Sequence, residues 1–273
     1  MDKASFLYRI EQFPLGKLWV FAIRQGWAAL FGGLLLCAIL LTSLVQLPWL
    51  HQYDWLFLFA VLIQVFMVIA KLEEPKEVIV IVLFHLVGLA MELFKTSGGI
   101  GSWTYPGEAV MRLGNVPLFS GFMYAAVGSY LARSWRVLHL SFTHFPHRRF
   151  IMLLAALIYI NFFTHHYLPD MRILLFVGLT VLFWRTTVHY VLASSRHRMP
   201  LLLGFGLIAL FIWFAENIGT LTKTWLYPAQ LVHWHPVGLQ KLGSWYLLMF
   251  ISFAMVDALH ALSNKRMGRI SPS

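Results

Sequence analysis

Long apolar segments with almost no charged residues are the feature that most constrains this chain. A helix that crosses a membrane needs about 20 mostly apolar residues, because the hydrocarbon core of a bilayer is about 30 Å thick. The segments of this kind cover residues 26–47, 53–70, 78–94, 116–131, 150–164, 171–189, 201–218 and 244–262. They are continuously apolar rather than alternating, which favours helices over a transmembrane barrel. We therefore expect an all-α integral membrane protein with about eight transmembrane helices.

Charged residues are too few to cover a water-facing surface. They make up 12% of the 273 residues, whereas soluble domains carry about 25%, and the mean hydropathy is +0.72. A soluble enzyme, a disordered chain and a nucleic-acid-binding protein are therefore disfavoured, and the spans leave no room for a sizeable soluble domain. Cys37 is the single cysteine, so neither an intrachain disulfide nor a cysteine metal cluster is expected.

The distribution of Lys and Arg predicts how the chain is oriented. Sixteen of the 21 lie in the N-terminal segment, in alternate loops and in the C-terminal tail, and five lie on the opposite side. Because such cations concentrate on cytoplasmic loops, we expect a multi-pass protein of the bacterial inner membrane with both termini in the cytoplasm. The formal net charge of +10 then reflects orientation and does not indicate a nucleic-acid partner.

The two ends of the chain lie outside the expected spans. Residues 1–25 mix Phe6, Ile10 and Trp19 with Arg9 and other charged side chains, which predicts an amphipathic helix at the membrane interface. No cleavable signal peptide is expected, because the first apolar segment begins only after about 25 residues and lacks a small-residue cleavage site. Residues 265–273 are expected to form a cytoplasmic tail.

Two similar segments indicate an internal repeat. Residues 91–107 and 215–230 each contain a Glu near the outer end of a span, a polar loop and a Trp-x-Tyr-Pro motif. The offset corresponds to four spans, which preserves direction through the bilayer. This predicts two parallel four-helix repeats, residues 26–140 and 141–264. The alternative is an aromatic belt followed by a turn that occurs twice by chance.

Ionisable side chains within spans are the first candidates for function, because a charge in the membrane is costly. We take Glu92 and Glu216 as candidate catalytic acids or bases, and His85 as a group that tunes Glu92 from the same helix face. A desolvated carboxyl can act as a general acid, and aromatic faces can stabilise a carbocation. The expected substrate-binding residues are Trp103, Tyr105, Trp225, Tyr227 and Asn217. The alternative for both glutamates is a structural hydrogen bond to the following loop.

A second group of polar residues lies on the expected outer side. His165, His166 and Asp170 could ligate zinc or iron, but their spacing matches no metal signature, and we expect no metal and no cofactor. Outer-side cations could instead hold a lipid phosphate, with unpatterned loop charges as the simpler alternative. These cations are Lys95, Arg112, Arg172 and Lys223.

The segment of residues 92–135 resembles a known family. Its pattern consists of Glu92, Thr96, Gly98, Gly101, Trp103, Tyr105, Gly114, Val116, Pro117 and Leu118. The chain resembles uncharacterised bacterial integral membrane proteins of the YoaT type. More distantly, it is similar to carotenoid hydratases acting on bisanhydrobacterioruberin and to heterodimeric lycopene cyclases, although Trp-x-Tyr-Pro replaces their Phe-Gly-x-Tyr-x-Tyr. The resemblance implies a membrane-embedded fold and, from the distant families, an isoprenoid substrate.

Three functions remain open. The first is a membrane enzyme that uses acid–base chemistry to hydrate, cyclise or isomerise an isoprenoid or another apolar lipid. The second is a transporter or lipid-binding protein with a site between the two halves. The third is a metal-dependent lipid hydrolase or desaturase. The expected partners are the bilayer and an apolar lipid ligand, and the oligomeric state stays open.

Overall fold

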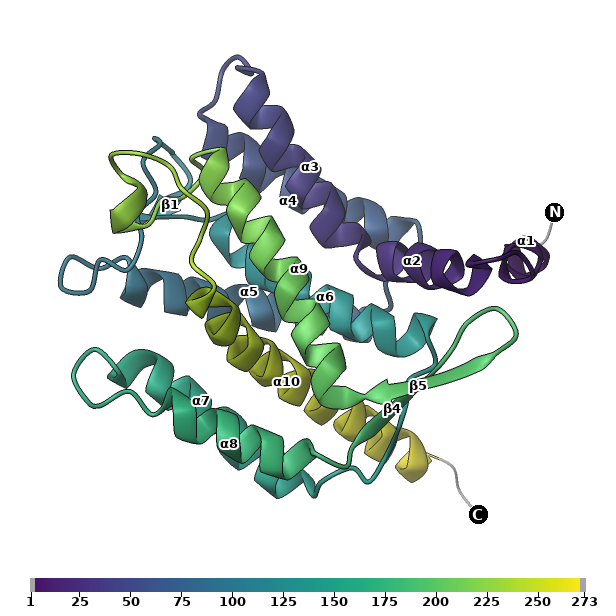
Figure 1. Cartoon of the computed structure of the whole chain (residues 1–273). Helices are drawn as coiled ribbons and strands as arrows, with labels where there is room; N and C mark the ends of the chain where they lie inside the picture. The colour runs from purple at the N-terminus through teal and green to yellow at the C-terminus, as the bar shows by residue number, and fades with distance from the viewer. Residues whose placement is uncertain (1–2, 271–273) are drawn as a thin grey trace.

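The computed structural model describes residues 3–270 and is mostly helical (Figure 1). Two short helices, α1 (Lys3–Glu11) and α2 (Gly16–Ala28), precede the first long one. Each apolar segment marked in the sequence contains one further helix. These helices are α3 (Leu30–Leu44), α4 (Gln52–Ile69), α5 (Pro75–Lys95), α6 (Ser120–Val137), α7 (Arg148–Thr164), α8 (Arg172–Phe183), α9 (Leu201–Leu221) and α10 (Gln240–Ile270). A short 3-10 helix, η1 (Pro228–Gln230), lies between the last two.

Four of these helices are long and apolar enough to cross a membrane. They are α4, residues Glu77–Lys95 of α5, all of α9, and residues Gln240–Leu262 of α10. A fifth candidate is the pair α2 and α3, which together pass the same test but meet at a bend of 74°. Since α7 has 17 residues and α8 has 12, these two are shorter than a typical span. The described chain is therefore that of a membrane protein with four or five candidate spans.

Short strands interrupt the helical pattern, contrary to the all-α expectation. A three-stranded antiparallel sheet has the order β3 (Ser141–Thr143), β4 (Thr187–Val191) and β5 (Arg196–Pro200). The expected span 171–189 was therefore too long, because its last residues form β4, where Val188 pairs with Phe142 and Met199. β-Branched and aromatic residues in this stretch favour a strand.

A second correction concerns the start of the fourth expected span. Its first residues form β2 (Val116–Pro117), which pairs with β1 (Arg112–Leu113). Gly114 links the two strands with a φ of +57°, a backbone conformation that glycine adopts without strain. Helix α6 begins only after this hairpin, at Ser120.

The N-terminal helices are anchored to the sheet. The Glu11 carboxylate at the end of α1 accepts hydrogen bonds from the Ser194 backbone N–H (2.9 Å) and hydroxyl (2.6 Å), and from Ser195. Val20 of α2 packs with Leu138 and Leu192. The segment expected to lie at the membrane interface thus also packs against the turn between β4 and β5.

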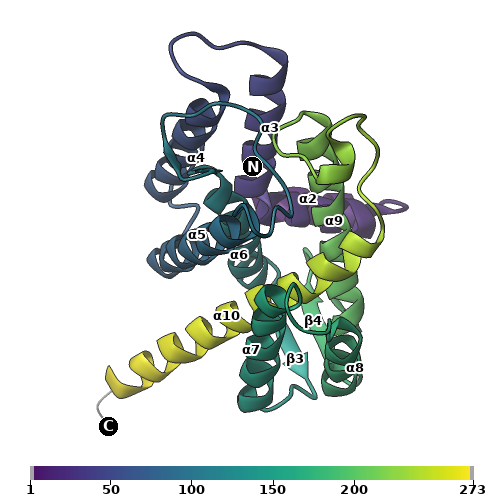
Figure 2. The ribbon, with the colours of Figure 1, turned by 90° about the vertical axis from the view of Figure 1, so that its left-hand side faces the viewer.

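Helix α10 lies at the centre of the arrangement. Figures 1 and 2 show it between α7 and α8 on one side and α5, α6 and α9 on the other. Helices α5 and α6 pack closely, because Gly88 leaves room for the Tyr124 ring: a Cβ at residue 88 would lie 2.5 Å from that ring. Helices α6 and α10, which follow the two candidate glutamates in the sequence, also pack against each other.

Candidate functional site

The two Trp-x-Tyr-Pro motifs lie side by side. The Thr104 N–H donates to the Leu226 carbonyl at 2.9 Å, and the Leu226 N–H donates to the Thr104 carbonyl at 2.9 Å. This reciprocal pair forms an isolated antiparallel bridge between the middle residues of the two motifs. Although 122 positions separate the motifs in the sequence, the bridge brings their aromatic residues to one place.

Glu92, near the end of α5, is fully enclosed by hydrogen-bond donors. Its side chain is 2% exposed. Its Oε2 accepts from Trp103 Nε1 at 2.7 Å and from the Tyr105 hydroxyl at 2.8 Å. Its Oε1 accepts from the Tyr124 hydroxyl of α6 at 2.9 Å. Of the three donors, Trp103 and Tyr105 were predicted to lie in the site, and Tyr124 was not.

Glu216, on α9, has a related but smaller set of donors. It is also 2% exposed. Its Oε1 accepts from the Tyr227 hydroxyl, and its Oε2 accepts from Trp245 Nε1 at 2.5 Å. Trp225, the counterpart of Trp103, does not donate to Glu216, because its ring lies against Gly219, where a Cβ would be 1.9 Å from it. Tyr227 was among the predicted site residues, and Trp245 was not.

The two tyrosines of the motifs are held as hydrogen-bond donors. Burial, together with the neighbouring Glu92 carboxylate, raises the pKa of Tyr105 well above its usual value. Burial and Glu216 raise the pKa of Tyr227 in the same way. Both phenols therefore keep their protons near neutral pH and donate to the carboxyl groups.

The donor types determine where each carboxyl group can carry a proton. An indole N–H donates and cannot accept, so Oε2 of Glu92, facing Trp103, and Oε2 of Glu216, facing Trp245, must be acceptors. Each indole favours the unprotonated form of the oxygen that it faces, so Oε1 is the better position for a proton on either carboxyl group. The tyrosine hydroxyl at Oε1, which both donates and accepts, would then accept from it.

Both glutamates line one large cavity. Its volume is about 870 Å³, and almost all of its wall is apolar. Four predicted aromatic residues also line it, namely Trp103, Tyr105, Trp225 and Tyr227. The structure therefore brings both predicted acids and these four aromatic residues together around a single space that is large enough for a lipid chain.

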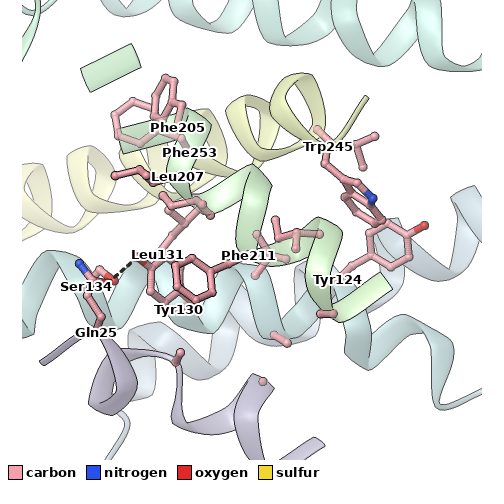
Figure 3. Close-up of a pocket in the computed structure, with 18 of the residues that line it drawn as sticks. Gln25, Tyr124, Tyr130, Leu131, Ser134, Phe205, Leu207, Phe211, Trp245 and Phe253 are labelled. Atoms are coloured by element: carbon pink, nitrogen blue, oxygen red, sulfur yellow. Dashed lines mark hydrogen bonds between the residues drawn. The ribbon is translucent and has the colours of Figure 1, made fainter. Parts of the chain in front are cut away.

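The cavity has polar groups at two separate places. Figure 3 shows Tyr124 and Trp245 at one end, near the glutamates, and Gln25, Tyr130 and Ser134 at the other. The Tyr130 hydroxyl donates to Gln25 Oε1 at 2.6 Å. Ten residues of α6 separate Tyr124 from Ser134, which corresponds to about 15 Å along the helix. The apolar part of the cavity lies between these two ends.

Lys241, at the start of α10, is a lining residue that the sequence did not single out. Its Nζ lies 3.9 Å from the centre of the Tyr227 ring and 5.9 Å from that of Trp103. These are cation–π distances. A fixed ammonium group thus already occupies one of the aromatic faces that had been expected to stabilise a carbocation.

Two of the predicted site residues lie elsewhere. His85 does not line the cavity; its ring packs on Phe122, with ring centres 4.4 Å apart, and no hydrogen bond joins it to Glu92. Asn217 donates to the Trp213 carbonyl of its own helix at 2.8 Å and accepts from the Val237 N–H, in the loop before α10, at 2.9 Å. These contacts favour a packing role for His85 and a loop-positioning role for Asn217.

The two histidines expected on the outer side are neighbours, and one ring nitrogen of each has a partner. The rings of His165 and His166 lie 4.1 Å apart. The Nε2 of His166 lies 2.7 Å from Lys95 Nζ, and Asp170 pairs with Arg172 at 2.5 Å. Within residues 3–270, no group of three or more His, Cys, Asp or Glu side chains is arranged to hold a metal ion. Lys95 and Arg172 lie against these side chains, and their positive charges disfavour a metal cation at the same place.

Tyr53 and Asp54 at the start of α4 hold the loops of the site in place. The Tyr53 hydroxyl donates to the Thr224 carbonyl at 2.8 Å and accepts from the Gly107 N–H at 3.1 Å, so it joins both motif loops. The buried Asp54 carboxylate accepts from the N–H of Met111 at 2.7 Å. The sequence analysis did not single out this pair; the signal that could have found it is a tyrosine followed by an acid at the start of an apolar segment.

Comparisons with known proteins place the chain in a family. Residues 17–253 match the family model described as "Protein of unknown function (DUF817)". The chain belongs to this family. It is also 45% identical, over 239 residues, to a protein of Bacillus subtilis (strain 168) described as "Uncharacterized protein YoaT", covering 88% of this chain and 90% of the relative. No solved structure matches. The YoaT-type resemblance is thereby confirmed, and the carotenoid-enzyme resemblance stays a prediction.

Proposed function

We propose that this DUF817 protein binds an isoprenoid or another apolar lipid in its central cavity and transforms it by acid–base chemistry. The observation that carries the proposal is the pair of buried carboxyl groups, Glu92 and Glu216, on the wall of one apolar cavity of about 870 Å³. Burying two carboxyl groups in such a place is costly, and a chemical role would account for them.

The expected reaction is a proton transfer at a carbon–carbon double bond. One carboxyl group donates the proton from its Oε1 to one carbon of the double bond, and the other carboxylate removes a proton from the allylic carbon next to the other end, so that the double bond moves by one position and the charges balance. The Lys241 ammonium on the Tyr227 face disfavours a discrete carbocation there. Isomerisation by coordinated transfer therefore suits the site better than hydration or cyclisation.

The test compares lipid extracts of cells that overproduce the wild type, Glu92→Gln or Glu216→Gln. A glutamine can accept from the indole and donate to the tyrosine, so we expect both variants to fold and to lose the product. Glu108→Gln is the matched control, because the Glu108 side chain is 84% exposed. Lipid and pigment profiles that are identical in the wild type and all variants would count against the enzyme.

A transporter or lipid carrier is the second candidate. It is favoured by the two polar ends of the cavity, at Tyr124 and at Ser134, which lie near opposite ends of α6. Such a protein would move a lipid between them without altering it. Flux of an unchanged lipid across proteoliposome membranes, retained in Glu92→Gln, would favour this function over the enzyme.

The membrane arrangement belongs to the same proposal. We take all of α3 to α10 as membrane-embedded, in two parallel four-helix halves that meet at the paired motifs, with both termini in the cytoplasm of a bacterium. The reciprocal bridge between Thr104 and Leu226 supports the repeat, since equivalent positions of the two halves face each other.

A further inference from the structure

A buried cation lies next to the site. Lys95, the last residue of α5, is 3% exposed. Its Nζ lies 2.7 Å from His166 Nε2 and 4.1 Å from the centre of the Phe162 ring. No carboxylate oxygen of the described residues lies within 4.0 Å of this ammonium group. A buried charge without a counter-ion is strongly unfavourable, so the position calls for an anion.

Two further cations face the same region. Lys95 is repelled by both Lys241 and Arg172, which belong to other helices, and is attracted by Asp170, which lies beyond 4.0 Å from it and pairs with Arg172. Arg172 also donates to the Ser244 hydroxyl at 3.3 Å. Lys241 likewise has no carboxylate of the described chain within 4.0 Å. The cluster of Lys95, Arg172 and Lys241 therefore draws on α5, α8 and α10.

The cation cluster borders the cavity. Lys241 lines the cavity wall. So do Phe162, whose ring contacts Lys95, and Ser244, whose hydroxyl accepts from Arg172. The acids near the cluster are already committed: Asp170 pairs with Arg172 at 2.5 Å, and Glu216 is held by its own donors. Two of the three cations, Lys95 and Lys241, are therefore left without a carboxylate partner at the cavity edge.

We propose that Lys95, Lys241 and Arg172 form a subsite for the phosphate group of a lipid whose chain fills the cavity. Two ammonium groups and a guanidinium match the charge and the several oxygens of a phosphate, and basic pockets between membrane helices bind lipid head groups in this way. This inference rests on the proposed function, because the chain occupies the same cavity. It makes the ligand an isoprenoid phosphate or a similar amphipathic lipid.

The test measures binding to the purified full-length protein in detergent with three probes: farnesyl phosphate, farnesol and inorganic phosphate. We expect farnesyl phosphate to bind at least about tenfold more tightly than farnesol, a difference that one good charge-assisted contact supplies. Inorganic phosphate should bind weakly, because it lacks the chain. In Lys95→Met, the advantage of farnesyl phosphate should disappear while the affinity for farnesol stays within about twofold, because Lys95 does not line the cavity. In Lys241→Met, whose side chain lines the cavity, the affinity for farnesyl phosphate should fall more than that for farnesol.

Two variants make the result specific. Lys223→Met removes the same charge from the outer side outside the cluster and should leave all three affinities unchanged. Lys95→Arg keeps the charge and should retain most of the farnesyl phosphate affinity, which separates loss of charge from loss of fold. Equal weakening by Lys223→Met and Lys95→Met would overturn the subsite.

The probes also separate this inference from the proposed function. Equal affinity for farnesyl phosphate and farnesol in the wild type would overturn the subsite alone, since the cavity would still hold an apolar lipid. Inorganic phosphate binding as tightly as farnesyl phosphate would overturn the lipid phosphate and indicate a site for a free anion. No binding of either isoprenoid would overturn the proposed function, and the subsite with it.

Discussion

Glu92 and Glu216 occupy matching places in two related sequence motifs, but different side chains hold their carboxyl groups. Glu92 has three donors, from Trp103, Tyr105 and Tyr124. Glu216 has two, from Tyr227 and Trp245. The tyrosine of the motif donates to the glutamate in both halves, whereas the motif tryptophan donates only in the first.

Loop length accounts for the difference. Eleven positions separate Glu92 from Trp103, and nine separate Glu216 from Trp225. The shorter loop returns Trp225 onto Gly219, one turn beyond Glu216 on the same helix, and the indole N–H that Glu216 needs comes from Trp245 of α10. A repeat can therefore preserve the position of an acid while changing how the acid is oriented.

The largest expected effect tests whether the two halves are parallel. In a Cys37→Ser background, single cysteines at Gly98 and Ala229, in the two motif loops, should both react with an impermeant thiol reagent added from the periplasm. A cysteine at Ser141 in β3 should react only after the cells are opened. Opposite accessibility of residues 98 and 229 would exclude the parallel repeat, because the two loops would then lie on different sides.

The next prediction uses the unequal number of donors. Glu92→Ala leaves three buried donors without an acceptor and should lower the free energy of unfolding by about 3 kcal/mol or more. Glu216→Ala leaves two, and we expect a loss that is smaller by about 1 kcal/mol. Thermal unfolding in detergent measures both. If Glu216→Ala proves the more damaging, the donors seen here do not determine the stability of the site.

The position of Trp225 gives a third test. Gly219→Ala would place a methyl group 1.9 Å from the Trp225 ring, so the ring must move. We expect a destabilisation of about 1–3 kcal/mol, as for other overpacked sites. Gly98→Ala is the matched control, since a Cβ at residue 98 meets nothing within 4 Å. Equal Tm values for both variants would show that Trp225 does not rest on Gly219.

The smallest expected effect concerns the additional donor of Glu92. Tyr124→Phe removes one hydroxyl group and leaves Trp103 and Tyr105 donating to Oε2. The free energy of unfolding should therefore fall by only about 1 kcal/mol. Because Tyr124 is the partner of the oxygen that can carry the proton, product formation should fall more than stability does. If product formation falls only in proportion to stability, Tyr124 serves packing and does not position the proton.

Much of the architecture could be predicted from the sequence, because it depends on local properties. An apolar segment excludes water along its whole length wherever it packs, so each marked segment contains a helix. The exceptions are the ends of two segments, at residues 116–117 and 187–189, which form strands. Strand pairing decided those ends: Val116 pairs with Leu113 across a tight local turn, and Val188 pairs with the distant Phe142. An apolar pattern alone does not report such pairing.

The candidate site was predictable to the same extent. A carboxyl group in a span is costly wherever it lies, so Glu92 and Glu216 were evident from the sequence, as was the recurrence of the motif beside each. The sequence could not show that Trp245 replaces Trp225, that His85 faces Phe122 or that Lys95 meets His166. Those contacts join residues between 29 and 71 positions apart, and only the packing of α5, α6, α9, α10 and the loop between α7 and α8 brings them within reach.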